Sequence, residues 1–415
     1  MNAFSYRLTL TALLAALCVA NARAEDPKSG TSMFSFSGFG TLGVVHSSEK
    51  NADFTSSVFK PDGAGYSESW SPGVDSRIGA QLTARFSRQF SALVQVVAEQ
   101  RYDDTYKPSV EWANIKYQFT PDLSARIGRI VLPVYMVSDF RKVGYANPWV
   151  RPPTEVYGTN PVTNIDGTDL SYRLHLGEIT TTLHGTYGRD YTSDYPHGVS
   201  SKARDVWGIV DTTEYGAASF YVSYLQSHIS LRPPIALFDA FRQFGPQGIA
   251  IADNYELIDK TVRVVTLGAS YDPGNWFSMA EWTHSKYHSF LGKSTGWYVS
   301  GGYRIGRFTP YITDAQVTNA ITSDPGLTLS TLPPYLAVPA AALNAGLNQV
   351  LARNPVQRTI SAGLRWDFTK NFDFKLQCDH TRLGPGSPGT LINVQPGFRS
   401  GGTLNLFSAT VDFVF

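Results

Sequence analysis

The chain has 415 residues, with 35 basic and 34 acidic side chains, a formal charge of +1, 36 glycines and 13% aromatic residues. The charge balance argues against a nucleic-acid-binding protein, which shows a clustered basic excess, and no stretch after residue 24 has the roughly eighteen consecutive apolar residues of a transmembrane helix. Glycine and aromatic side chains in these amounts favour strands and tight turns, so the composition indicates an all-β protein.

Residues 1–24 have the features of a secretory signal peptide. A positively charged residue precedes an apolar core at residues 8–20, and a small-x-small cleavage motif ends at Ala24. The apolar core is too short to span a bilayer as a helix. We therefore expect one domain in residues 25–415, where Cys378 is the single cysteine, so that an intramolecular disulfide and metal motifs built on cysteine pairs are excluded.

Alternation of apolar and polar residues, the period of a strand, recurs along the rest of the chain. In the clearest case Ile78 and Leu82 share one face of a predicted strand, and Arg77 and Arg85 share the other. Strands are predicted in this way near residues 33–46, 75–86, 90–101, 110–119, 123–131, 168–176, 179–188, 205–211, 216–227, 261–272, 276–285, 296–305, 308–318, 359–368, 372–381 and 408–415, which makes sixteen.

The connections between these strands alternate in length. Short polar turns are expected at residues 87–89, 120–122, 177–178, 272–275 and 369–371. Longer loops are expected at about residues 47–74, 102–108, 132–166, 190–204, 228–259, 286–295, 319–355 and 383–401, with short helices at 238–244 and 337–351. Short turns on one rim and long loops on the other are typical of an outer-membrane barrel, whose strands need about ten residues each. A soluble sandwich, the alternative for alternating strands, has no reason to separate its loops in this way.

The stretch 131–166 interrupts the alternation. It contains five prolines, which lack the N–H donor that a central strand needs, and it shows no helical periodicity. It is also too aromatic for a solvated linker and carries charges of both signs. We therefore predict that residues 132–166 form a loop that folds into the lumen of the barrel and sets its bore.

Three segments resemble the Gram-negative outer-membrane porin superfamily: the opening FSFSGFGTLGV at residues 34–44, ARIGR at residues 125–129, and the closing ATVDFVF at residues 409–415. The resemblance implies a transmembrane antiparallel β-barrel of about sixteen strands, usually a homotrimer, in the bacterial outer membrane among lipids and lipopolysaccharide. In this family the loop after the fifth strand constricts the pore, and the predicted inner loop holds that position. The family's C-terminal aromatic residue is recognised by the barrel-assembly machinery, and Phe415 matches it. The tract at residues 144–158 departs from the acid-rich loops of general porins, so the resemblance leaves the selectivity open.

The polar faces of the predicted strands must line the lumen, because a charge turned toward lipid near the midplane costs roughly 2–4 kcal/mol. Charged residues of the wall and the inner loop are therefore pore-lining candidates: Arg77, Arg85, Arg101, Lys116, Arg126, Asp139, Arg141, Arg151, Glu155 and Asp166, with Glu99, Arg173, Arg365 and Lys375 also on the wall. Wall arginines opposite Asp139, Glu155 and Asp166 would produce a transverse field that favours polar solutes. Each arginine has an alternative role as a strut that pairs with a loop carboxylate. Basic wall residues outnumber acidic ones, which hints at a preference for anions.

A passive diffusion channel for small hydrophilic solutes or ions is the predicted function. An outer-membrane hydrolase would need a nucleophile beside a base, but no serine or aspartate lies at a telling spacing from the histidines. The histidines concerned, which are also too scattered for a metal site, are His175, His184, His284 and His288. Neither catalysis nor a cofactor is predicted, and a plugged transporter of roughly twenty-two strands does not fit in this length. A receptor or adhesin with a blocked lumen stays open as an alternative.

Overall fold

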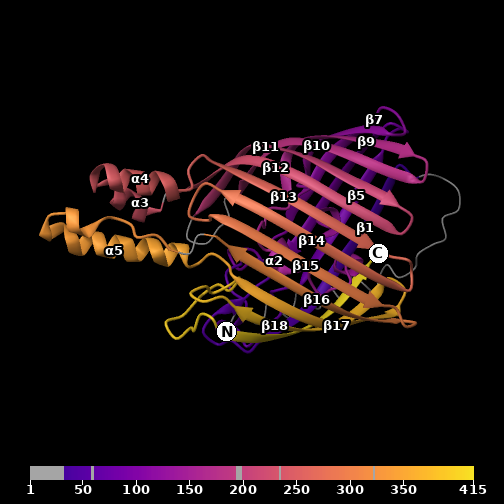
Figure 1. Cartoon of the computed structure of the whole chain (residues 1–415). Helices are drawn as coiled ribbons and strands as arrows, with labels where there is room; N and C mark the ends of the chain where they lie inside the picture. The colour runs from indigo at the N-terminus through magenta and orange to yellow at the C-terminus, as the bar shows by residue number, and fades with distance from the viewer. Residues whose placement is uncertain (1–31, 58–59, 193–198, 233–234, 321–322) are drawn as a thin grey trace.

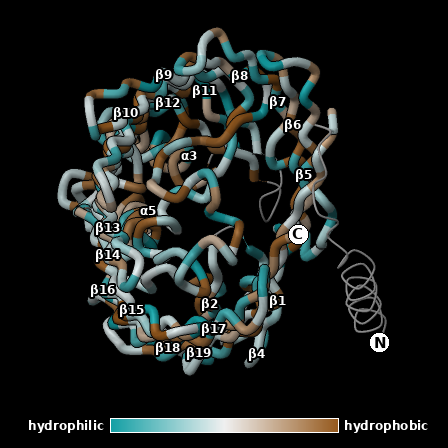
Figure 2. Tube along the Cα trace, turned by 90° about the vertical axis from the view of Figure 1, so that its right-hand side faces the viewer, coloured by the Kyte–Doolittle hydropathy of each residue, from teal (hydrophilic) through white to brown (hydrophobic). Residues whose placement is uncertain are grey.

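The computed structural model describes residues 32–57, 60–192, 199–232, 235–320 and 323–415, and the predicted signal peptide lies outside these ranges. Sixteen long strands form a closed antiparallel barrel in which each strand pairs with its neighbours in the sequence. The barrel closes because β1 (Phe34–Ser47) pairs on one side with β5 (Arg77–Arg85) and on the other with β19 (Thr403–Val414). Figure 1 shows the strands side by side, and Figure 2 shows them as a ring.

All sixteen predicted strands are confirmed. Between β5 and β19 the barrel contains, in order, β6 (Phe90–Glu99), β7 (Ser109–Gln118), β8 (Leu123–Val131), β9 (Asn164–Leu176), β10 (Ile179–Thr192), β11 (Ser200–Tyr215), β12 (Ala218–Arg232), β13 (Lys260–Tyr271), β14 (Trp276–Tyr287), β15 (Lys293–Tyr303), β16 (Phe308–Asn319), β17 (Gln357–Thr369) and β18 (Phe372–Leu383). Three two-residue strands that the sequence does not predict lie in the first long loop: β2 (Asp53–Phe54), β3 (Ala64–Gly65) and β4 (Trp70–Ser71).

Several strands begin earlier than the sequence predicts, among them β9, β11 and β19. The strand β9 begins at Asn164, so the long connection after β8 ends at residue 163 instead of 166, and β11 begins at Ser200 within a predicted loop. In β9, Asp166 forms an ion pair of 2.8 Å with Arg129 of β8. Pairs of opposite charge across neighbouring strands stabilise a sheet, but they do not produce the apolar alternation that identifies a strand in the sequence.

The hydrophobic pattern of the barrel is inverted relative to that of a water-soluble protein. Large apolar side chains are exposed on the outer face, for example Ile127 at 64% and Ile312 at 60%. Polar side chains such as Thr266 and Asp412 are buried on the inner face. This distribution is the one expected of a barrel whose outer face contacts lipid, and it confirms the predicted class, a transmembrane β-barrel.

The two rims of the barrel differ in the length of their connections, as predicted. At the short-turn rim the chain reverses through tight turns, and Gly177 (φ 65°) and Asn371 (φ 67°) adopt the left-handed conformation that such turns require. The C-terminus also lies there, because Gly38 and Phe415 exchange backbone hydrogen bonds of 2.8 and 3.0 Å. Exposed aromatic side chains of strand ends and turns gather near this rim, as in an interfacial aromatic girdle: Phe34, Phe36, Phe86, Phe90, Trp276, Tyr303, Phe308 and Phe415.

A helical unit projects from the opposite, long-loop rim (Figure 1). It consists of α3 (Ala236–Arg242) and α4 (Gly245–Tyr255) from the loop after β12, and α5 (Pro334–Leu351), preceded by the 3-10 turn η4 (Leu329–Thr331), from the loop after β16. These helices share a core of their own, made by Phe238, Phe241, Ala252, Tyr255, Leu327, Ala340, Leu347 and Leu351. Among the described residues, no helix is both long and apolar enough to cross a membrane.

The sequence predicts two of these three helices. The predicted helix 337–351 is confirmed and begins three residues earlier, and the predicted helix 238–244 corresponds to α3. The helix α4 is missing from the prediction because its sequence, GPQGIAIADNY, contains two glycines and a proline, which have low helix propensity. Packing against α3 stabilises it instead, through the buried side chains of Ala252 and Tyr255.

Candidate functional site

The long connection between β8 and β9, the β8–β9 segment (residues 132–163), has little regular structure. It contains two 3-10 turns, η1 (Ser138–Phe140) and η2 (Gly144–Ala146), and the short helix α2 (Thr154–Tyr157). Its prolines prevent anything longer. Its side chains Tyr135, Trp149 and Tyr157 nevertheless form part of the principal buried cluster, together with side chains of β11 to β16. The segment therefore packs against the inner face of these strands.

Trp149 occupies the centre of this contact. Its side chain is 1% exposed, and the indole Nε1–H lies 2.9 Å from the hydroxyl of Ser300 and 3.1 Å from that of Thr313. The ring also meets Tyr298 edge to face, with 5.5 Å between the ring centroids. Buried indoles normally need such a partner for the N–H group. Trp149 is thus fixed to β15 and β16 by both packing and hydrogen bonds.

Arg151 forms a bidentate ionic contact. Its guanidinium donates to both carboxylate oxygens of Asp75, at 2.9 and 2.6 Å, and lies 3.4 Å from Asp379. It also donates to the hydroxyl of Ser408 at 2.7 Å. The side chains of Arg151, Asp75 and Asp379 are each less than 7% exposed. Bidentate arginine–carboxylate pairs combine strength with a fixed geometry. Arg151 therefore joins the segment to the first long loop and to β18 and β19.

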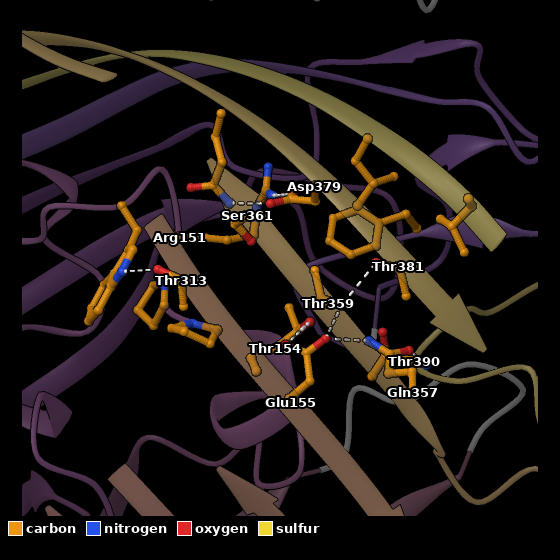
Figure 3. A pocket seen from close by; sticks show the side chains of 18 of the residues that line it. Arg151, Thr154, Glu155, Thr313, Gln357, Thr359, Ser361, Asp379, Thr381 and Thr390 are labelled. Carbon is orange, nitrogen blue, oxygen red and sulfur yellow. Dashed lines mark hydrogen bonds and ion pairs between the residues drawn. The ribbon is translucent and has the colours of Figure 1, made fainter. Parts of the chain in front are cut away.

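Glu155 points away from the arginines that the sequence places opposite it. Its carboxylate accepts hydrogen bonds from Gln357, at 2.7 Å, and from Thr359, both on β17 (Figure 3). Burial raises the pKa of the Glu155 carboxyl, and the two hydrogen bonds oppose that shift. The cavity around it measures only about 30 Å³, which has room for no more than a few water molecules. This side of the lumen is therefore filled.

Two basic residues that the sequence places on the pore wall instead hold the backbone of the segment. The ammonium of Lys375, completely buried, donates to the carbonyl of Gly144 at 2.7 Å and lies 3.0 Å from Asp412. Arg365 donates to the carbonyls of Tyr145, at 2.8 Å, and Asn147, at 3.2 Å. Lys375 is on β18, which pairs with β19, and Arg365 is on β17, which pairs with β18. They hold the segment as struts, but through its backbone carbonyls and not through the loop carboxylates that the sequence predicts.

On the opposite side, one side chain connects the segment with β6 and β7. The ammonium of Lys142 lies 2.7 Å from both Glu99 and Glu111. Burial by itself lowers the pKa of Lys142, but the two carboxylates outweigh burial and raise it. Arg77 of β5 approaches Glu99 at 3.8 Å. Because Trp149, Glu155 and the carbonyl of Gly144 are held by side chains of β15 to β18, the segment is attached to both sides of the barrel interior.

Sequence reasoning does not include Lys142 or Glu111 among the candidates. Lys142 follows Arg141 in a segment whose path inside the barrel the sequence does not reveal, and Glu111 is the only acidic residue of its strand. Glu111 is the extra residue of a β-bulge, because Gln95 of β6 pairs with Trp112 and the next residue, Val96, pairs with Val110. A bulge is not visible in the alternation of a single strand.

The larger of two open cavities, of about 400 Å³, is lined by the first long loop, the rim ends of β5 to β10 and the β8–β9 segment. It brings together four of the predicted pore-lining residues, Arg77, Arg101, Arg141 and Arg151. Arg77 and Lys142 compete there for Glu99. Charged groups of both signs therefore face open space in this part of the lumen.

The second cavity, of about 330 Å³, lies nearer the short-turn rim and is also polar. It brings together four other candidates, which are Arg85, Lys116, Arg126 and Asp139. The first three are on β5, β7 and β8, and Asp139 is on the β8–β9 segment. Arg126 also pairs with Asp169 at 2.6 Å. Of the three carboxylates that the sequence places opposite the wall, only Asp139 lies in a cavity with wall arginines.

Asp166 is separated from this arrangement. It lies in β9, not in the segment, and its exposed carboxylate pairs with Arg129 at 2.8 Å. Across the described parts of the chain, no group of three or more histidine, cysteine, aspartate or glutamate side chains is placed to hold a metal ion. Of the four histidines considered in the sequence, His175 lies 3.5 Å from Asp122, with both side chains exposed.

Comparison with known proteins identifies the fold. No protein-family model matches the chain, and no curated protein is significantly similar to it in sequence. Among solved structures, the outer membrane channel DcaP of Acinetobacter baumannii is similar with a TM-score of 0.58 and 13% identity, over 92% of this chain and 97% of that one. OmpF of Salmonella typhi, solved as a complex with daunomycin, has a TM-score of 0.55 and 13% identity over 92% and 97% of the two chains.

An anion-selective porin from Comamonas acidovorans is similar to the same extent, with a TM-score of 0.52 and 12% identity over 92% of this chain and 99% of that one. Each of these three neighbours covers 92% of this chain. At such low identity the likeness concerns the fold. The porin-type barrel of sixteen strands that the sequence predicts is confirmed.

Proposed function

We propose that this porin-fold barrel is a passive diffusion channel of the bacterial outer membrane, through which small hydrophilic solutes or ions pass without chemical conversion. The observation that carries the proposal is the distribution of space inside the barrel. The half of the lumen beside β15 to β19 is filled by Trp149, Arg151 and Glu155, whereas cavities of about 400 and 330 Å³ lie along β5 to β8. A permeation path along β5 to β8 follows, with the β8–β9 segment as its constriction.

The charges along this path support a channel for polar solutes. Asp139 on the segment shares a cavity with Arg85, Lys116 and Arg126 on the wall, which separates negative from positive charge across the bore. A transverse field of this kind orients polar solutes and disfavours apolar ones. Catalysis is not part of the proposal, since the solved neighbours with the porin fold include a named channel and a named porin.

Export and assembly follow the same proposal. Residues 1–24 act as the signal peptide, and the barrel-assembly machinery recognises Phe415 at the short-turn rim. The barrel forms a homotrimer in contact with membrane lipids and lipopolysaccharide. The exposed apolar outer face supports the lipid contact.

Planar-bilayer recording of the purified protein tests the proposal. We expect stepwise conductance that grows with salt concentration, and a zero-current potential that shifts toward cation preference in Arg85→Glu, because this change reverses a charge in the smaller cavity. The matched control is Arg88→Glu, three residues away in an exposed turn that does not line the cavity. A correctly assembled barrel that never conducts, or equal shifts in both variants, contradicts the proposal.

A receptor or adhesin with a blocked lumen is the second candidate. Two observations favour it: the helical unit of α3, α4 and α5 projects beyond the long-loop rim (Figure 1), and Lys142 bridges the bore to Glu99 and Glu111. The same recording separates the two functions. A blocked lumen predicts no conductance in the wild type and the appearance of steps in Lys142→Ala.

A further inference from the structure

The larger cavity holds an excess of positive charge that its own walls do not neutralise. Seven basic and three acidic side chains line it. Two of the basic ones, Arg129 and Arg151, pair with carboxylates outside the cavity, Asp166 and Asp75. When these two are set aside, together with Arg101, which also has a partner, four basic side chains still face three acidic ones. Anions therefore experience a net attraction in this part of the lumen.

Lys60 is one source of the excess. It comes from the first long loop, is only 7% exposed, and donates to the carbonyl of Gly73 at 3.0 Å. Within the described ranges it forms no ion pair with a carboxylate, and the nearby Glu99 is already shared by Arg77 and Lys142. Burial lowers the pKa of Lys60 to about 8, while Glu99 opposes this shift. A buried ammonium without a paired anion is unfavourable, so an incoming anion gains from meeting it.

Arg141 is the second source. Its guanidinium donates to the backbone carbonyls of Asn160, at 2.9 Å, and Tyr157, and lies 5.6 Å from the centre of the Tyr157 ring. These contacts occupy two of the five donors that a guanidinium carries. In the part of the chain that the structure describes, no carboxylate forms an ion pair with Arg141. Its charge is permanent at any physiological pH, and its remaining donors suit a carboxylate group.

We propose that this cavity is a binding site for small organic carboxylates, with Lys60 and Arg141 as the ligands of the carboxylate group. The inference rests on the proposed channel function and names the solute class that the channel takes. At about 400 Å³ the cavity is within the roughly 300–1,000 Å³ typical of small-molecule sites. Tyr102, Pro152 and Val162 add apolar surface to its wall. This surface suits a carboxylate with an apolar body better than a bare inorganic anion.

Benzoate and benzamide are the probes that test the site, because they have the same ring and differ in charge. Binding to the detergent-purified wild type is measured by titration calorimetry, and block of the KCl current is measured in planar bilayers. We expect saturable binding of benzoate, and a reduction of current that depends on its concentration from the long-loop side. Benzamide should produce neither effect at the same concentrations.

Single substitutions assign the ligands. Arg141→Gln and Lys60→Gln should each weaken benzoate binding about tenfold or more, because each removes a charge-assisted hydrogen bond. Arg141→Lys keeps the charge without the planar fork and should have an intermediate affinity. Lys293→Gln is the matched control, since Lys293 is exposed at the same rim and lines no part of the cavity. The KCl conductance of each variant reports whether it has assembled.

The outcomes separate this inference from the channel function. A conducting protein that binds benzoate no better than benzamide, or that binds it equally in Arg141→Gln, Lys60→Gln and Lys293→Gln, overturns the carboxylate site and leaves the channel intact. Benzoate binding by a protein that never conducts overturns the channel function and keeps the site. If Arg141→Gln alone loses both benzoate binding and conductance, Arg141→Lys decides the cause. This second variant must then recover both benzoate binding and conductance.

Discussion

Replacing Arg151 by methionine tests whether ionic anchoring holds the β8–β9 segment inside the barrel. In the structure Arg151 is 6% exposed, and its bidentate partner Asp75 and second partner Asp379 are 2% and 5% exposed. Arg151→Met keeps most of the side-chain volume but leaves two carboxylates buried without their cation. Breaking a buried pair in this way costs roughly 3–5 kcal/mol. An energetic cost of this size makes release of the segment roughly a hundred to several thousand times more frequent than in the wild type.

The barrel itself should survive this change, because the strand ladder does not involve the Arg151 side chain. Two measurements detect release: proteolytic cleavage within residues 132–163 of the folded barrel, and larger, noisier single-channel conductance. The matched control is Arg358→Met. Arg358 contacts Asp314 at 2.6 Å but is 54% exposed, and exposed pairs of this kind contribute roughly 0–1 kcal/mol.

A double variant makes the test sharper. Replacing Asp75 by asparagine in the Arg151→Met background removes one of the two unpaired buried charges, so protease resistance should partly return. Wild-type conductance and protease resistance in Arg151→Met would refute the reasoning. Equal sensitivity of Arg151→Met and Arg358→Met would refute it as well, because burial would then make no difference to the two pairs.

Two further predictions concern the same segment and the larger cavity. Trp149→Ala should lower the free energy of unfolding by roughly 3–5 kcal/mol, because it leaves a cavity in the buried cluster. Trp149→Phe keeps an aromatic ring but loses the N–H donor and part of the buried volume, so it should cost less than Trp149→Ala. Thermal unfolding followed by gel mobility measures both. Raising the pH from 7 to 9 should reduce anion preference, because the pKa of Lys60 near 8 means that its positive charge is present below this pH and lost above it. The charged groups that act on Lys60 are Glu99, Arg77, Asp75 and Lys142, and a pH effect of the same size in Lys60→Met would show that another group is responsible.

The strands and their connections follow from the sequence alone. In β5, Ile78 and Leu82 alternate with Arg77 and Gln81, and this pattern depends only on residues two positions apart. Turn residues such as Asn371 mark the reversals in the same local way. The prolines of the β8–β9 segment exclude a strand there for a reason contained in each residue itself. Local chemistry of this kind is complete in a single sequence, so sixteen strands and the irregular segment between β8 and β9 are predictable.

The partners of the charged residues depend on the tertiary structure. Glu155 was expected opposite wall arginines, but it bonds to Gln357, which is 202 residues away in the sequence. Lys142, absent from the candidates, reaches Glu99 and Glu111 across the bore. Such contacts are determined by the closure of the barrel and by the path of the segment through it, which place distant residues together. No periodicity in the chain records that path, and for this reason only the folded barrel shows which side of the lumen is filled and which is open.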